Sequence, residues 1–132
     1  MDEDIRRLEA IHRHCADVAF VIDSNQGYTR KEAATFVKGV NRIGGNILLL
    51  EQPLAKDDLE GHAQLRRDFH VPIAADESAQ SLHDLQAVIQ HHAADYINIE
   101  ITKSGVLEGI AIATLAKTFG LHLMIGGMVI VQ

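Results

Sequence analysis

Four acidic residues each close an apolar stretch of this sequence. Asp23 ends "AFVID", Glu51 ends "ILLLE", Asp76 ends "PIAAD" and Glu100 ends "INIE". They are separated by 28, 25 and 24 positions, the length of one strand-and-helix unit of a parallel α/β fold. Because the carboxyl ends of parallel strands meet at one edge of a sheet, we expect these carboxylates to lie close together.

Carboxylates a few ångströms apart repel one another, so their convergence requires a positive charge among them. A divalent cation such as Mg²⁺ prefers oxygen ligands, and three acids from neighbouring strands suit it. In the alternative interpretation, each acid is solvated or caps the helix that follows its strand. The regular spacing of the acids favours the metal site.

The stretch "YINIEITKSG", residues 96–105, carries polar side chains on one face of a predicted strand. Alternation with a period of two places Asn98, Glu100 and Thr102 together, with isoleucines on the opposite face. A polar row on so apolar a strand indicates a face that is turned to water or to a site. Lys103 follows on the other parity, and we expect it in solvent or at a helix end.

Helical and strand patterns alternate along the chain, which predicts an α/β fold of βα units around a parallel sheet. Thr29 with Glu32 three residues later has the form of a capping box. With 47% hydrophobic and 23% charged residues, the 132-residue chain has the composition of one globular domain. The predicted helices are 2–16, 29–43, 56–69, 81–93 and 105–119, and the predicted strands are 18–23, 46–51, 72–76, 95–101 and 121–126.

Composition excludes several classes of partner. The net charge is −6 and the twelve Lys and Arg residues are scattered, so no basic surface for nucleic acid is predicted. No apolar stretch reaches the roughly 20 residues that cross a bilayer, and the N-terminal "MDEDIRRLEA" is acidic, unlike a signal peptide. We therefore expect a cytoplasmic protein without membrane or nucleic-acid partners, in which the single Cys15 is reduced.

The motifs "DSNQGYT", "EQPL", "ADES" and "KSG" occur in this order, and together they resemble the enolase superfamily in its muconate-lactonizing and dipeptide-epimerase branch. The resemblance implies a partial TIM-type (β/α) barrel of about five parallel strands in which Asp23, Glu51 and Asp76 hold Mg²⁺. It also implies a small carboxylate substrate, which binds the metal while a lysine removes the adjacent proton and the ion stabilises the enolate. Asn25, in the Asp-x-Asn motif, and Gly126, where backbone can approach a ligand, are candidate substrate-binding residues.

The sequence departs from that family at the bases. Glu100 stands where the second lysine base is expected, three positions before Lys103, and no Lys-x-Lys motif occurs in the sequence. A carboxylate is a far weaker base than an amine, so we expect weak or no turnover, with Glu100 and Lys103 as the remaining catalytic candidates. Glu100 has a further possible role as an additional metal ligand.

The length also departs from a complete barrel, which needs about 250 residues. We expect residues 1–132 to form a single partial barrel domain without the N-terminal capping domain and without the first and last barrel strands. Two bare sheet edges favour association, and a homodimer that completes the barrel is the expected form. Two alternatives have no role for the motifs: a receiver-like signalling domain and a non-catalytic α/β interaction module.

Overall fold

The computed structural model describes residues 2–127, which form one sheet with helices between its strands. The strands are β1 Ala19–Asp23, β2 Asn46–Glu51, β3 Ile73–Ala75, β4 Tyr96–Glu100 and β5 His122–Gly126. The helices are α1 Asp2–His14, α2 Arg30–Arg42, α3 Leu59–Phe69, α4 Leu82–His91, α5 Ile101–Ser104 and α6 Val106–Thr118, and Glu77–Ala79 forms the 3₁₀-helix η1. No helix in this part of the chain is both long and apolar enough to span a bilayer.

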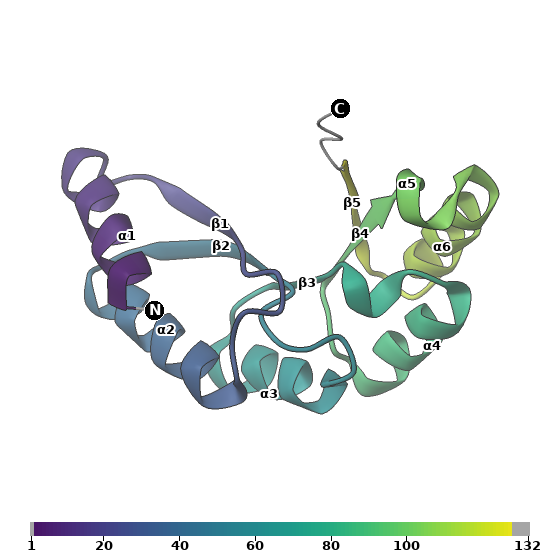
Figure 1. Cartoon of the computed structure of the whole chain (residues 1–132), viewed down its shortest axis with the longest axis horizontal. Helices are drawn as coiled ribbons and strands as arrows, with labels where there is room; N and C mark the ends of the chain where they lie inside the picture. Colours follow the sequence, from purple (N-terminus) through teal and green to yellow (C-terminus); the bar gives the residue numbers. More distant parts are fainter. Residues whose placement is uncertain (1, 128–132) are drawn as a thin grey trace.

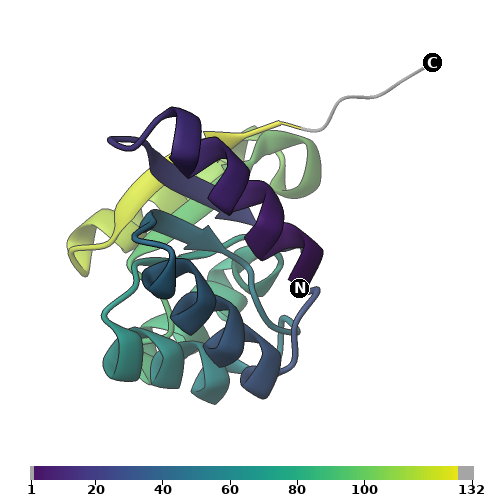
Figure 2. The same ribbon diagram turned by 90° about the vertical axis from the view of Figure 1, so that its left-hand side faces the viewer.

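The five strands are all parallel and lie in the order β1-β2-β3-β4-β5. The sheet curls into an open arch with the helices on its convex side, so that the concave side is uncovered (Figure 1). Seen from the side, α1 runs across the molecule in front of β1 (Figure 2). This is part of a (β/α) barrel, as predicted. The sequential strand order excludes the receiver-like alternative, whose doubly wound sheet has the order 2-1-3-4-5.

The hydrophobic core lies between the convex face of the sheet and the helices. It is built from strand residues that alternate inward and from the apolar stripe of each helix. The predicted capping box starts α2: Thr29 accepts a hydrogen bond from the Glu32 backbone N–H, and the Glu32 side chain accepts one from the Thr29 N–H. The largest fully buried apolar side chains of the core are Phe36, Leu50, Leu54, Ile73, Leu85, Ile97 and Ile112.

One boundary difference changes the site. The predicted strand 95–101 ends at Glu100, and Ile101 begins the single helical turn α5. Gly105, whose φ is +76°, ends this turn and donates its N–H to the Ile101 carbonyl. Thr102 therefore does not continue the strand face, and the parity argument that placed Lys103 in solvent does not apply.

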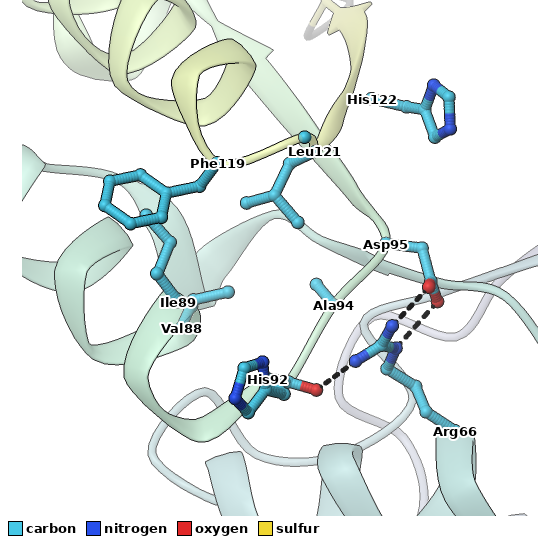
Figure 3. A pocket seen from close by; sticks show the side chains of 10 residues that line it. Arg66, Val88, Ile89, His92, Ala94, Asp95, Phe119, Leu121 and His122 are labelled. Carbon is cyan, nitrogen blue, oxygen red and sulfur yellow. Dashed lines mark hydrogen bonds and ion pairs between the residues drawn. The ribbon is translucent and has the colours of Figure 1, made fainter.

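The amino ends of the strands are held together by one ion pair. Arg66 donates to both carboxylate oxygens of Asp95, over 2.8 and 2.5 Å, and also to the His92 carbonyl (Figure 3). Asp95 in turn accepts the Ile73 N–H at 2.9 Å. The hollow beside this pair, of about 270 Å³, is also lined by apolar side chains such as Phe119. Since its charged groups are satisfied by one another, this end of the sheet has a structural role.

Candidate active site

A hollow of about 570 Å³ lies at the carboxyl ends of the strands, and we call it the rim hollow. It is lined by all of the candidate metal, catalytic and substrate-binding residues: Asp23, Asn25, Glu51, Asp76, Glu100, Lys103 and Gly126. Asp23 and Glu51 are directly paired across β1 and β2, and Glu100 and Gly126 across β4 and β5. The expected convergence of the strand ends is therefore present, while the role of each side chain remains a prediction.

Asp23 is engaged by its own loop. Its two carboxylate oxygens accept hydrogen bonds of 3.0 Å from the backbone N–H and the side-chain amide of Asn25. Asn25 adopts a left-handed conformation, with φ at +42°, which brings its amide back over the carboxylate. In this arrangement Asn25 orients Asp23, a role different from the predicted contact with substrate.

Glu51 is buried, with 7% of its surface exposed, and accepts a hydrogen bond of 2.6 Å from the Asn98 side chain. Burial raises the pKa of Glu51, and the nearby carboxylates Asp23 and Asp76 add to the effect, while the Asn98 hydrogen bond opposes it. The charged form of Glu51 is therefore held at a cost that a cation in the rim hollow would relieve.

Gly126, which has no Cβ atom, leaves space for the side chain of Asn98. A Cβ atom at Gly126 would lie 2.6 Å from both terminal atoms of the Asn98 amide, so the amide would have to move. The glycine on β5 thus lets the Asn98 amide reach Glu51. This contact is within the protein, so Gly126 supports the site through Asn98, and a direct contact with substrate remains a prediction.

Lys103 is part of the rim hollow and does not lie free in solvent. Its ammonium lies 2.6 Å from a carboxylate oxygen of Glu100 and donates to both oxygens of Asp76, at 3.1 and 3.3 Å. Burial raises the pKa of Asp76, and the hydrogen bond from Lys103 opposes the rise. Burial lowers the pKa of Lys103, but the contact of its ammonium with Glu100 and the hydrogen bonds that it donates to Asp76 outweigh burial and raise the pKa overall.

The donor atoms of the rim hollow suit a hard cation. Two oxygens of residues that line it, the amide Oδ1 of Asn98 and the carboxylate Oε2 of Glu77, are buried acceptors without a hydrogen-bond partner in the structure. Unpaired buried acceptors are costly, and a cation satisfies them. Among residues 2–127, however, no three acidic, histidine or cysteine side chains already stand in a metal-binding cluster. Each of the three expected ligands instead accepts a hydrogen bond within the protein: Asp23 from Asn25, Glu51 from Asn98 and Asp76 from Lys103.

Gln52 connects the loops behind these carboxylates, a role that the sequence analysis did not predict. Its side chain is fully buried, and its carbonyl oxygen accepts the backbone N–H groups of Asp76 and Ser78 at 3.0 and 3.1 Å. Its amide donates to the Leu54 carbonyl and to the Ser78 hydroxyl. In the "EQP" motif, Glu51 thus faces the rim hollow, and Gln52 braces the turn that presents Asp76.

His62 completes this buried polar group. Its Nδ1 lies 2.8 Å from the Asp58 carbonyl and must donate to it, which leaves Nε2 as the acceptor facing the Gln52 amide at 3.4 Å. Burial lowers the pKa of His62. The histidine is therefore neutral in the folded protein at neutral pH. A buried His and a buried Gln at positions 62 and 52 carry no sequence signal, because neither position breaks the helical or strand pattern.

The open half-barrel with acids at successive strand ends defines a (β/α)-barrel domain whose site lies at the carboxyl end of the sheet. A family model described as enolase C-terminal domain-like matches residues 1–132. The chain belongs to this family, and the resemblance to the muconate-lactonizing and dipeptide-epimerase branch is confirmed.

The relatives match nearly the whole length of this chain and are much longer than it. The L-Ala-D/L-Glu epimerase of Thermotoga maritima is 39% identical over 128 residues, which are 97% of this chain and 37% of that protein. A mandelate racemase/muconate lactonizing enzyme from Roseiflexus sp. has a TM-score of 0.92 and 40% identity, covering 98% of this chain and 36% of its own. The chain therefore spans little more than a third of the length of these relatives.

A third relative has a ligand in its solved structure. The dipeptide epimerase from Enterococcus faecalis V583, complexed with Mg and the dipeptide L-Leu-L-Tyr, has a TM-score of 0.87 and 32% identity. It covers 95% of this chain, which corresponds to 35% of the epimerase. The fold of residues 2–127 is thus that of one region of a longer enzyme.

Replacing Gln52 by Leu is predicted to lower the free energy of unfolding by about 2–4 kcal/mol, because two buried backbone N–H groups lose their acceptor. Urea denaturation measures the change. The matched control is Gln64→Leu on α3, an exposed glutamine, for which a change below about 0.5 kcal/mol is expected. Equal effects of the two substitutions would contradict the bracing role of Gln52.

Stability is predicted to depend on the protonation of His62. The folded pKa lies below the unfolded value of about 6.5, so the contribution to stability is present above about pH 6.5. It is lost as the pH falls through the lower, folded pKa. Urea denaturation between pH 5 and 8 should show this loss, and His62→Gln should flatten the profile. The exposed His83 provides the control, since His83→Gln should leave the profile of the wild type unchanged.

Proposed function

We propose that this chain is a magnesium-binding barrel region of an enolase-superfamily protein, with Asp23, Glu51 and Asp76 as the metal ligands. The observation that carries the proposal is that these three carboxylates, from three adjacent strands, line one hollow in which Glu51 and Asp76 are buried. The Mg named in the structure of the Enterococcus faecalis relative supports the same choice of ion.

In this proposal, neighbouring side chains orient each of the three metal ligands. Asn25 orients Asp23, Asn98 orients Glu51, and the Gln52 brace presents Asp76. When bound, the ion supplies Lewis-acid stabilisation of negative charge on a substrate carboxylate. The named activities of the relatives indicate the substrate class, a dipeptide or a similar small carboxylate.

We propose that proton abstraction by this chain is weak or absent. Glu100 occupies the position expected for a base, but its carboxylate is bound to the Lys103 ammonium. Lys103 is held protonated by Glu100 and Asp76, so it has no free electron pair with which to remove a proton. Neither catalytic candidate is therefore in the state that the chemistry of a base requires.

We also propose that the chain associates into a homodimer. The edge strands β1 and β5 each have one side without a neighbouring strand among residues 2–127. Exposed apolar side chains lie on or beside these edges, with 58% of Val21, 56% of Leu48 and 78% of Ile125 exposed. Pairing of the edges would cover both features. The expected cytoplasmic location stays a prediction.

Calorimetric titration is predicted to show Mg²⁺ binding at millimolar or lower concentration. The substitutions Asp23→Asn, Glu51→Gln and Asp76→Asn should each weaken binding by about tenfold or more, since each removes a charged oxygen ligand. Asp68→Asn, which removes an exposed carboxylate of α3, is the control and should leave the affinity unchanged. Absence of binding to the unmodified chain would refute the proposed metal site.

In D₂O with Mg²⁺, dipeptides such as L-Ala-L-Glu are predicted to gain no deuterium at Cα above the buffer background, because both candidate bases are unavailable. Mass spectrometry or proton NMR measures the incorporation. An incorporation rate that rises in proportion to protein concentration, and disappears with Asp76→Asn, would contradict the prediction.

Sedimentation velocity is predicted to detect a homodimer at micromolar concentration. Ile125→Lys, which places a charge on the β5 edge, should shift the population toward monomer. Thr35→Lys, on the exposed face of the central helix α2, is the control and should leave the distribution as it is. A stable monomer at every concentration would rule out the dimer.

A further inference from the structure

The ammonium group of Lys103 stands where the carboxylates of two strand ends meet. It contacts Glu100, which ends β4, at 2.6 Å, and Asp76, which follows β3, at 3.1 Å. Only 24% of the Lys103 side chain is exposed, and the two acidic side chains are more buried still. The two carboxylates are therefore largely buried, while Lys103, an exposed residue, places its ammonium between them.

A single helical turn, α5, places this ammonium group between the two carboxylates. Helix α5 is a single turn directly after Glu100, so Lys103 lies three residues on and above the end of its own strand. Gly105, with φ at +76°, ends the turn and lets α6 begin in a new direction. As a result, the flexible lysine side chain can reach Asp76 from the neighbouring strand.

Lys103 is the only cation among the described side chains that line the rim hollow, against five carboxylates. One acceptor of the same hollow is also unsatisfied. Asn98 is only 6% exposed, and its buried Oδ1 has no hydrogen-bond partner. One ammonium group cannot compensate all of these oxygens. The rim hollow therefore has capacity for a second cation, and one ligand of that cation, Asp76, is already occupied.

We infer that Lys103 is a tethered competitor for the divalent cation, and that Glu100 is the second holding position to which Lys103 withdraws when Asp76 is given to the metal. The inference rests on the proposed magnesium site and adds its regulation. The two positions are already set by the contacts, since the same ammonium lies within ion-pair distance of both carboxylates. With Glu100 as a partner, Lys103 can leave Asp76 without becoming an uncompensated buried charge.

Metal titration of variants tests this competition. Lys103→Met should bind Mg²⁺ or Mn²⁺ about tenfold more tightly than the unmodified chain, because Asp76 no longer exchanges one cation for another. The matched control is Lys56→Met, which removes an equal charge from an exposed lysine on the loop after β2 and should change the affinity by less than about threefold. Equal changes in the two variants would overturn the inference.

A double-mutant cycle separates competition from net charge. Glu100→Gln removes the holding position, so it should weaken metal binding by about tenfold when Lys103 is present, and by about threefold or less in the Lys103→Met background. If the loss is the same in both backgrounds, Lys103 and Glu100 are not coupled in the way inferred, and the inference fails.

The outcomes distinguish this inference from the proposed function. Binding by Lys103→Met but not by the unmodified chain would support the competitor and refute metal binding by the natural side chains. Binding by both with equal affinity would keep the metal site and refute the competitor, and binding by neither would refute both. Thermal denaturation checks that each variant is folded, and Lys103→Gln replaces Lys103→Met in the same comparison if the latter is not.

Discussion

Compensation of like charges at the carboxyl ends of the strands is the constraint on which this structure depends. Parallel strands of similar length bring acids at their ends to one place, and every such acid needs a donor or a cation near it. The chain meets this need differently at each strand: an amide on the loop for Asp23, an amide on β4 for Glu51, and an ammonium for Asp76. The left-handed conformation of Asn25, the missing Cβ of Gly126 and the helical turn α5 each accompany one of these contacts.

Much of the fold was predictable from the sequence, because the apolar patterns are regular and the acids mark the strand ends. The five strands, their parallel arrangement and the convergence of Asp23, Glu51 and Asp76 required only periodicity and spacing. Lys103 lies at a helix end, one of its two expected positions, but its contacts with Glu100 and Asp76 were not foreseen, because the argument extended the strand pattern past Glu100. Isoleucine at position 101 favours a strand, so its residue type did not reveal that the helical turn α5 begins there.

The roles of Gln52 and His62 could not be predicted from the sequence, for a different reason. The hydrophobic pattern of the sequence does not indicate which way the polar side chains of Gln52 and His62 point. Their roles depend on contacts with residues 10 and 26 positions away. Burial of an amide is tolerable only when its donors and acceptors are all matched, and that matching is a property of the assembled loops. The proline after Gln52 was a visible clue, since it marks a turn in which a buried side chain replaces regular backbone pairing.

The ion pair between Arg66 and Asp95 at the amino ends of the strands has a consequence for evolution. It connects α3, β3 and β4 at the end of the sheet opposite the rim hollow. The stability of the fold therefore does not depend on the side chains of the rim hollow alone. A change of side chain at the rim is therefore compatible with an intact fold. Residues there are free to diverge in evolution without loss of the scaffold that carries them.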